Sequence, residues 1–251
     1  MDNRKKYNFD CFTIKNYEKI VQLAISKGFS FIKHNDVFKL ERKDVIWRHD
    51  VEFSPDVALK MAEIEANNGV HSTYFFQLHS EYYNLLERYF SDKLLKIKEL
   101  GHEIGLHFDA HYYNINSEGE LDRYITQDKQ YFEYVFDLKL NTFSFHNTNS
   151  FILSCTKEKY GGLINVYSDF LKMNYQYCTD STGFWRFEVL EDVLNDPNVQ
   201  HLHVLTHDAM WSDEVLSPRH RVMNSIQLNA ERIKRQYDDF FLNSKAQNID
   251  Y

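Results

Sequence analysis

The sequence predicts an α/β fold organised as a single domain. Short apolar segments typical of strands alternate with longer segments whose apolar residues recur every three or four positions, and this alternation favours parallel strands joined by helices. The 251 residues fit one such domain, because α/β barrels commonly contain about 200–250 residues. Hydrophobic residues make up 43% of the chain, which is enough for a large core. With only 8 Gly and 3 Pro, no linker stands out.

The helices and strands follow in order from the chain's apolar patterns. A helix is expected over 13–27, ending before Gly28, and a short strand over 29–31. Ser54-Pro55 provides a helix start, and the helix that follows ends near Gly69. The further expected segments are strands at 45–47, 73–76, 103–106, 142–145, about 175–178 and 202–205, and helices at about 94–100, 118–136 and 224–241.

Polar residues collect where these strands end. In parallel α/β sheets the chemistry gathers at the carboxyl ends of the strands. The residues at those ends here are Asp50, Glu52, His107, His146, Asp180 and His207. The sequence therefore predicts an active site at one edge of the sheet.

Composition and charge exclude several function classes. The net charge of −8 disfavours a nucleic-acid partner, because binding to phosphates relies on a basic surface. The first ten residues lack the apolar stretch of a signal peptide, and no long apolar run predicts a membrane span. Cys11, Cys155 and Cys178 are odd in number and widely spaced, which favours free thiols. We expect a cytoplasmic protein without a membrane partner; the oligomeric state does not follow from the sequence.

The segment from Gly101 to His111 contains candidate metal ligands. His107 and His111 are four residues apart and would share a face of a helix or an extended segment, whereas His102 and His107 would point to opposite faces of a strand. Neutral imidazoles that converge from one side suit a divalent metal ion. Among 12 histidines this spacing also arises by chance, so a structural role for the pair is an equal alternative.

The segment Arg48-His49-Asp50-Val51-Glu52 adds two carboxylates. In an extended chain Asp50 and Glu52 lie on the same side, and their mutual repulsion suggests a metal or a base role. The alternative is that Asp50 caps the helix that begins near Ser54.

Two later segments supply further candidates. His207 lies just beyond a predicted strand, where a general acid would be placed. Asp180 could orient this histidine. Trp185 could form a wall of a sugar-sized pocket or could be an ordinary core residue.

Taken together and in this order, these motifs resemble the polysaccharide deacetylase (NodB-homology) superfamily, also called carbohydrate esterase family four. The resemblance includes Gly101-His102-Glu103-Ile104-Gly105 and covers roughly residues 13–220. It is greatest for a branch whose first motif is Arg-His-Asp-Val-Asp, here 48–52. The resemblance implies a distorted (β/α)7 barrel over residues 41–251, with residues 1–40 as a helical extension packed on it.

The same resemblance implies roles for individual residues. Asp50 matches the catalytic base, Glu52 the acidic metal ligand, and His207 the general acid with Asp180 as its partner. His107 and His111 match the metal histidines, and the metal is expected to be a divalent ion, with zinc favoured by imidazole and carboxylate ligands.

The chain differs from the family pattern at three places, one of which is Asp208, which follows His207 where the branch usually has proline. Glu52 replaces an Asp, so Asp50 remains an alternative metal ligand. Ser144-Phe145-His146-Asn147 replaces an Arg-Pro-Pro-Tyr type motif. His146, Asn147, Trp185 and Arg186 are expected to contact substrate, and Arg48 or Arg186 could act near the base. The predicted activity is metal-dependent removal of an acetyl group from an N-acetylated sugar or polysaccharide precursor. Hydrolysis of a small non-sugar amide or cyclic ureide, and carbohydrate binding without catalysis, are the alternatives.

Overall fold

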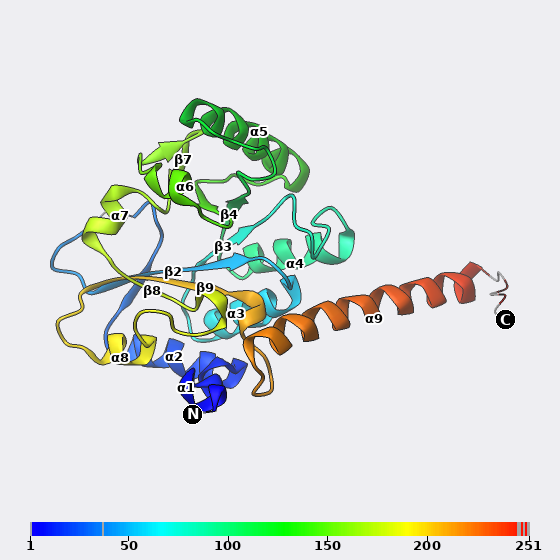
Figure 1. The fold of residues 1–251 in the computed structure, drawn as a ribbon, viewed down its shortest axis with the longest axis horizontal. Helices are drawn as coiled ribbons and strands as arrows, with labels where there is room; N and C mark the ends of the chain where they lie inside the picture. The colour runs from blue at the N-terminus through cyan, green and yellow to red at the C-terminus, as the bar shows by residue number, and fades with distance from the viewer. Residues whose placement is uncertain (1, 37, 245–246, 248, 250–251) are drawn as a thin grey trace.

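The computed structural model describes residues 2–36, 38–244, 247 and 249. Parallel strands alternate with helices along the chain, so the predicted α/β class is confirmed (Figure 1). The strands are β1 (Ser30–Ile32), β2 (Asp44–Val51), β3 (Thr73–Phe76), β4 (Glu103–Phe108), β5 (Thr142–Phe145), β6 (Lys159–Tyr160), β7 (Leu163–Asn165), β8 (Gln176–Thr179) and β9 (His201–His207). The α-helices are α1 (Asn3–Lys6), α2 (Ile14–Ser26), α3 (Pro55–Asn67), α4 (Arg88–Glu99), α5 (Glu118–Phe136), α6 (Ser150–Ser154), α7 (Asp169–Asn174), α8 (Leu190–Asn195) and α9 (Pro218–Ser244). Short 3-10 helices occupy Phe9–Phe12 (η1), Ser181–Gly183 (η2) and Asp208–Met210 (η3).

The strands form one curled sheet in the order β6-β7-β5-β4-β3-β2-β9-β8, and β1 pairs with the first half of β2. Every pairing from β7 to β8 is parallel, and only β6 runs antiparallel to its neighbour. Within the described residues, seven parallel strands therefore follow one another across the sheet, and no hydrogen-bonded pairing joins β7 to β8. This architecture is the predicted distorted (β/α)7 barrel, open between its two edges.

The register of the central strands brings the predicted site residues to one edge. Asp50 at the end of β2 is the partner of His207 at the end of β9. His107 on β4 is the partner of Ser144 on β5. Because these strands are parallel, their carboxyl ends meet at the same side of the sheet, as the sequence predicted.

The helix boundaries follow from local capping signals. The hydroxyl of Ser54 accepts a hydrogen bond from the backbone N–H of Val57, and Pro55 occupies the first turn, as predicted. Ser217-Pro218 repeats this signal at the start of α9, where the Ser217 hydroxyl accepts from the backbone N–H of His220. The last helix is therefore longer than the predicted 224–241.

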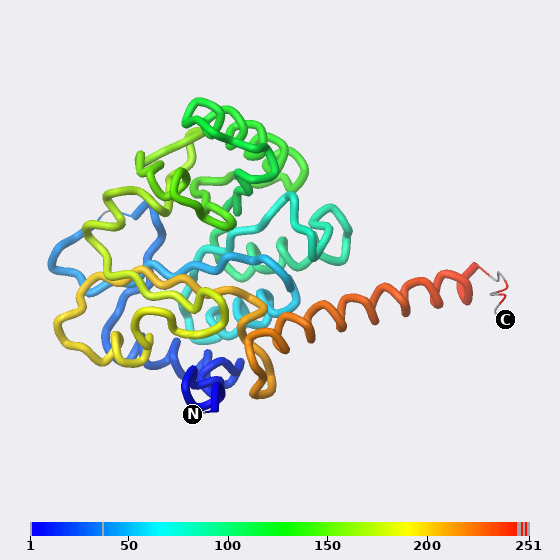
Figure 2. Tube along the Cα trace, viewed as in Figure 1, coloured from blue at the N-terminus to red at the C-terminus, as the bar shows by residue number. Residues whose placement is uncertain are grey.

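The N-terminal segment packs on the sheet and on the start of α9. α2 buries Tyr17 and Val21 in a core cluster that includes Trp47 of β2. A guanidinium nitrogen of Arg221 donates to the carbonyl of Phe9 at 3.5 Å, and Figure 2 shows these two parts of the chain side by side. Among the described residues, no helix is both long enough and apolar enough to cross a membrane.

Candidate metal centre and acid–base site

Glu52, His107 and His146 converge at the carboxyl ends of β2, β4 and β5. Nε2 of His107 lies 3.2 Å from Oε1 of Glu52, and Nδ1 of His146 lies 2.8 Å from the same oxygen. The two ring nitrogens are 3.1 Å apart. Ligands of a tetrahedral zinc ion with bonds near 2.1 Å are separated by roughly 3.4 Å. The spacing of these three atoms is therefore suitable for binding a divalent metal ion. Within the described part of the chain, Glu52, His107 and His146 form a group of potential metal ligands.

Electrostatics within this group favour the charged carboxylate. Burial alone would raise the pKa of Glu52, but hydrogen bonds from His107 and His146 outweigh it and hold this pKa well below its usual range. Burial opposes protonation of His146, yet the hydrogen bond to Glu52 raises the pKa of this histidine. An ionised carboxylate oxygen that faces two ring nitrogens is a suitable donor set for a cation.

Asp208 fixes the backbone that carries Glu52. Its carboxylate accepts hydrogen bonds from the backbone N–H groups of Glu52 at 2.7 Å and Phe53 at 3.2 Å, and also from that of Ser54. Burial raises the pKa of Asp208 to about 6, although these N–H donors act in the opposite direction. The start of η3 therefore holds the loop between β2 and α3 in place.

His111 lies outside the ligand group. β4 ends at Phe108, and the carboxylate of Asp109 then accepts from the backbone N–H groups of His111 and Tyr112, which turns the chain. Nε2 of His111 is 2.7 Å from the carbonyl oxygen of Asn147. The spacing argument for His107 and His111 assumed a regular helix or strand, and this turn removes that condition. The structure brings His146 to the place that the sequence analysis gave to His111.

Asp50 is held in a buried ion pair. Nη1 of Arg48 lies 2.8 and 2.9 Å from the two carboxylate oxygens of Asp50, and both side chains are almost fully buried. The hydroxyl of Ser144 donates to Asp50 at 3.0 Å. Nδ1 of His107 is 3.9 Å from Asp50, on the side of the ring away from Glu52. Asp50 therefore stands beside the ligand group but is not one of its members.

His207 and Asp180 form the predicted pair. Nδ1 of His207 is 2.7 Å from Asp180, whose carboxylate also accepts from the His207 backbone N–H and from Nε1 of Trp211. Burial acts to lower the pKa of His207, but the hydrogen bond and the charge of Asp180 raise it to about 9. This histidine is thus cationic at neutral pH, and within the described residues its Nε2 has no hydrogen-bond partner, so it can face a substrate.

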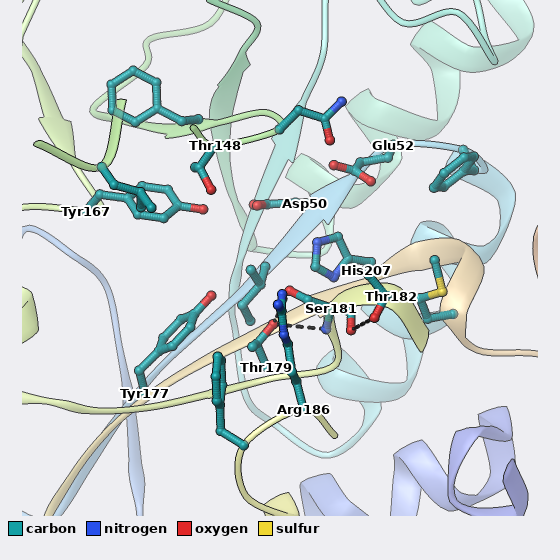
Figure 3. A pocket seen from close by; sticks show the side chains of 17 residues that line it. Asp50, Glu52, Thr148, Tyr167, Tyr177, Thr179, Ser181, Thr182, Arg186 and His207 are labelled. Atoms are coloured by element: carbon teal, nitrogen blue, oxygen red, sulfur yellow. Dashed lines mark hydrogen bonds between the residues drawn. The ribbon is translucent and has the colours of Figure 1, made fainter. Parts of the chain in front are cut away.

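Asp50, Glu52 and His207 line one cavity of about 590 Å³. Figure 3 shows Asp50, Glu52 and His207 directed into the same space, with the hydroxyls of Tyr167 and Tyr177 approaching from the other side. Phe53, Phe145 and Phe187 add apolar surface, and Thr148, Thr179, Ser181 and Thr182 add hydroxyls. The size is typical of small-molecule sites, which occupy roughly 300–1,000 Å³.

The other predicted substrate contacts lie in different surroundings. Arg186 and Asn147 line the cavity. Asn147 adopts a left-handed backbone with φ of 46°, and its side-chain amide is 2.8 Å from Nε2 of His146. Trp185 packs against Phe12 and Trp211 and is not among the residues that line the cavity. Its position favours the core alternative, and its contact with substrate stays a prediction.

Sequence reasoning did not assign two partners of Asp50. Arg48 was one of two candidates near the base, and Ser144 had no role. A usable signal was present, because residues two apart in a strand share a face. This alternation puts Arg48 on the same face of the chain as Asp50, and Ser144 on the same face as His146. Both partners of Asp50 therefore belong to motifs that the sequence analysis had already identified.

Comparisons with known proteins give similar folds at low sequence identity. No protein-family model matches the chain, and no curated protein matches its sequence. The family 4 esterase domain of a multidomain xylanase from the hindgut metagenome of Trinervitermes trinervoides is 12% identical, with 84% of this chain and 96% of that chain covered and a TM-score of 0.45. The chitin deacetylase of the fungal pathogen Colletotrichum lindemuthianum is 16% identical, with coverages of 79% and 85% and a TM-score of 0.46. A family 4 carbohydrate esterase from Bacillus anthracis is 14% identical, with coverages of 84% and 85% and a TM-score of 0.41. At such identities the function of this chain has to be argued from its own residues.

Proposed function

We propose that this chain is a metal-dependent hydrolase that removes an acetyl group from an N-acetylated sugar. One observation carries the proposal: a carboxylate lies with two imidazoles at the spacing of metal ligands, and the same carboxylate lines one cavity together with a fixed carboxylate and a cationic histidine. Hydrolysis of an amide needs an electrophilic carbonyl, a proton acceptor for water and a proton donor for the amine. The site offers candidates for all three.

Glu52, His107 and His146 would hold the metal ion. A divalent ion there would supply a Lewis acid that polarises the acetamide carbonyl and acidifies water. His146 would use Nδ1, so its Nε2 would carry the ring proton. The amide nitrogen of Asn147 lies 2.8 Å from Nε2 in this structure, and a rotation of that amide would present its oxygen as the acceptor. Such a hydrogen bond orients a metal-binding imidazole and fixes its tautomer.

Asp50 and His207 would move the protons. Asp50 accepts a proton from the attacking water, and the Arg48 ion pair and the Ser144 hydroxyl hold its carboxylate in place. His207, cationic through its contact with Asp180, donates a proton to the departing nitrogen. The amide C–N bond is thereby replaced by a C–O bond, and the products are acetate and a free amine.

The cavity lining supports a saccharide as substrate. Tyrosine and phenylalanine rings provide flat apolar surface, while threonine and serine hydroxyls can hydrogen-bond to sugar hydroxyls. Arg186 adds a cation at the same cavity, which suits a sugar that also carries a negative group.

The test is acetate release from N-acetylated sugars and oligosaccharides after loading the protein with zinc, cobalt, nickel or iron. We expect turnover that a chelator abolishes and that added metal restores. Small amides and cyclic ureides, assayed in parallel, identify the non-sugar alternative if they alone are hydrolysed. Saccharide binding without turnover in every metal-loaded sample would contradict the proposal and support the non-catalytic alternative.

A further inference from the structure

A second cavity, here called the side pocket, lies beside the catalytic cavity and has a volume of about 330 Å³. It shares Leu153, Tyr167, Tyr177 and Phe187 with the catalytic cavity, and Figure 3 shows the two tyrosines on the side opposite Glu52. Helix α7, which connects β7 to β8, supplies another part of its wall. Because no pairing joins β7 to β8 in the described structure, the side pocket lies on the open side of the barrel.

Arg48 presents an unused hydrogen-bonding edge in this region. Its Nη1 contacts Asp50 and Ser144, whereas Nε and Nη2 are buried and have no hydrogen-bond partner among the described residues. The hydrogens on Nε and Nη2 point in the same direction from the planar guanidinium, and this pair of donors matches the two oxygens of a carboxylate. Arg48 lines the side pocket and is not among the residues that line the catalytic cavity. Because buried donors in proteins are nearly always paired, the unused edge points to an acceptor that a ligand supplies.

His203 adds a third buried nitrogen to the same pocket. It lies on β9 and lines the side pocket, and its Nε2 has no hydrogen-bond partner in the described structure. Burial and the charge of Arg48 hold the pKa of His203 well below its usual range, so the ring is neutral. A neutral imidazole carries one N–H, and the tautomer protonated at Nε2 donates to an acceptor without adding charge. Arg48 and His203 therefore offer donors to one anionic group.

The charge of the lining favours an anion. Arg48 and Lys172 are the cationic side chains of the side pocket, and its described lining contains no Asp or Glu. Asp50 contacts Arg48, lines the catalytic cavity and compensates one of the two positive charges. Nζ of Lys172 donates to the backbone carbonyl of Leu153 at 3.2 Å, which is an uncharged partner. A ligand with a single negative charge would balance the remaining positive charge.

The rest of the wall is largely apolar. Val166, Leu171 and Tyr175 are buried, and each lines the side pocket. Such a wall stabilises a hydrocarbon group but offers no donors to the additional oxygens of a phosphate or sulfate. A carboxylate places both of its oxygens on the Arg48 edge and leaves none for the wall.

We propose that the side pocket binds a small monocarboxylate with an apolar body. The two carboxylate oxygens accept hydrogen bonds from Nε and Nη2 of Arg48, and Nε2 of His203 donates to one of them. The hydrocarbon part packs against Val166 and Leu171. This binding does not rest on the proposed function, because none of the three candidate metal ligands lines the side pocket.

The test is binding of butyrate to the full chain, measured by saturation-transfer NMR, with butyramide as the uncharged analogue of similar size. The protein is treated with phenanthroline, which removes metal without adding a carboxylate, so that a metal ion cannot hold the butyrate. We expect butyrate to bind about tenfold or more tightly than butyramide, because only the carboxylate accepts from both donors of Arg48. Equal dissociation constants for the two compounds, or no saturation transfer to butyrate, would overturn the proposal.

Substitutions on α7 test whether the side pocket holds the butyrate. Leu171→Trp fills the pocket and leaves the Arg48–Asp50 pair in place, so it should weaken butyrate binding by about tenfold or more. Met173→Trp is the matched control, because Met173 lies on the same helix, is 78% exposed and is not among the lining residues, and this variant should bind butyrate as the wild type does. Circular dichroism checks that both variants fold. Unchanged butyrate binding in Leu171→Trp would contradict the proposal.

Two further variants separate the side pocket from the catalytic cavity. Arg48→Lys keeps a positive charge but loses the paired donors, so its affinity for butyrate should fall to that for butyramide. His207→Gln removes a cation that lines the catalytic cavity, and it should leave butyrate binding unchanged. Loss of binding in His207→Gln together with retention in Leu171→Trp would place the carboxylate in the catalytic cavity and refute a site at Arg48.

Discussion

The two faces of β2 carry similar side chains in different states. On the side that faces the barrel interior, Arg48 pairs with Asp50, and Asp50 and Glu52 line the cavity. Toward the helices, His49 contacts the carboxylate of Glu65 at 2.9 Å. Both faces of this eight-residue strand therefore lie beside a site that combines an acidic group with histidine.

The outer face is closed and satisfied. Glu65 accepts hydrogen bonds from the hydroxyls of Tyr17 and Tyr74, and His49 uses its second nitrogen for Thr206 at 2.8 Å. Glu65 and His49 are both fully buried. Burial acts to raise the pKa of Glu65, but the charge and the hydrogen bond of His49 outweigh burial and lower this pKa to about 2. In the described structure, two tyrosine hydroxyls and one ring nitrogen of His49 converge on this buried carboxylate, which occupies it fully.

The inner face is open. The side chains of Glu52 and His146 are each 16% exposed, their ligand atoms lie 2.8 Å apart, and each residue lines a cavity. A complete and sealed polar network stabilises a fold, whereas converging atoms at a cavity edge can bind. A structural and a functional carboxylate therefore differ in how deeply they are buried and in whether all their hydrogen-bond partners are already present. The residue types alone do not reveal this difference.

The largest expected effect comes from the open face. His146→Ala should remove the bound metal and lower turnover on the order of 10⁴-fold, because the metal supplies several kcal/mol of transition-state stabilisation. Metal analysis of the purified variant and acetate release would measure both. His111→Ala is the matched control, since the ring of His111 contacts the backbone carbonyl of Asn147 in the described structure, and this variant should keep the metal. Loss of metal from His111→Ala with retention in His146→Ala would restore the ligand set that the sequence predicted.

Asp50→Asn separates metal binding from base catalysis on the same face. The variant should retain the metal, because Asp50 is outside the ligand group, and turnover should fall about 10²–10⁴-fold, as expected for loss of a general base. Metal content and kcat measured on the same preparation would check it. An emptied site in this variant would show that Asp50, rather than Glu52, is the ligand.

The sequence predicted the barrel better than the site, for a physical reason. Strands such as 73–76 and helix 118–136 follow from local apolar periods and capping residues, which act over a few positions. The pairing of Asp180 with His207 was predicted because both follow strand ends. The position of His146 among the metal ligands was not predicted from the sequence. It depends on the turn after β4 and on the pairing of β5 with β4, which are set only in the folded sheet.

Removing charge from the closed face should cost stability rather than metal. Glu65→Gln removes a buried carboxylate that accepts hydrogen bonds from Tyr17 and Tyr74, and the lowered pKa of Glu65 implies a loss of about 3 kcal/mol in the free energy of unfolding at pH 7. Because the folded pKa of Glu65, about 2, lies below its unfolded value, this stabilisation is present above about pH 4.3 and is lost as the pH falls toward 2. The difference between variant and wild type should therefore shrink in acid.

Urea unfolding at pH 7 and pH 3, with metal analysis alongside, would measure this. Glu63→Gln, on the exposed side of α3, should change the free energy of unfolding by less than about 0.5 kcal/mol. If Glu65→Gln unfolded normally but lost its metal, the closed face would have a role in binding and the contrast between the two faces would fail.

The smallest effect should be a change in pH dependence on the open face. Asp180 raises the pKa of His207 to about 9, so the proton donor is charged below that pH and is lost as the pH rises through it. A cation bound at Glu52 offsets the contribution of that carboxylate, so the alkaline limb of kcat/KM in the metal-loaded protein should lie at or below pH 9. Asp180→Asn should move this limb toward the ordinary histidine value of about 6.5 and reduce kcat/KM at pH 8 by about tenfold or more, with a smaller loss at pH 6. Asp213→Asn, whose carboxylate is 70% exposed, should leave the limb in place. An unchanged limb in Asp180→Asn would mean that another group donates the proton, because no other carboxylate contacts Nδ1 of His207 in the described structure.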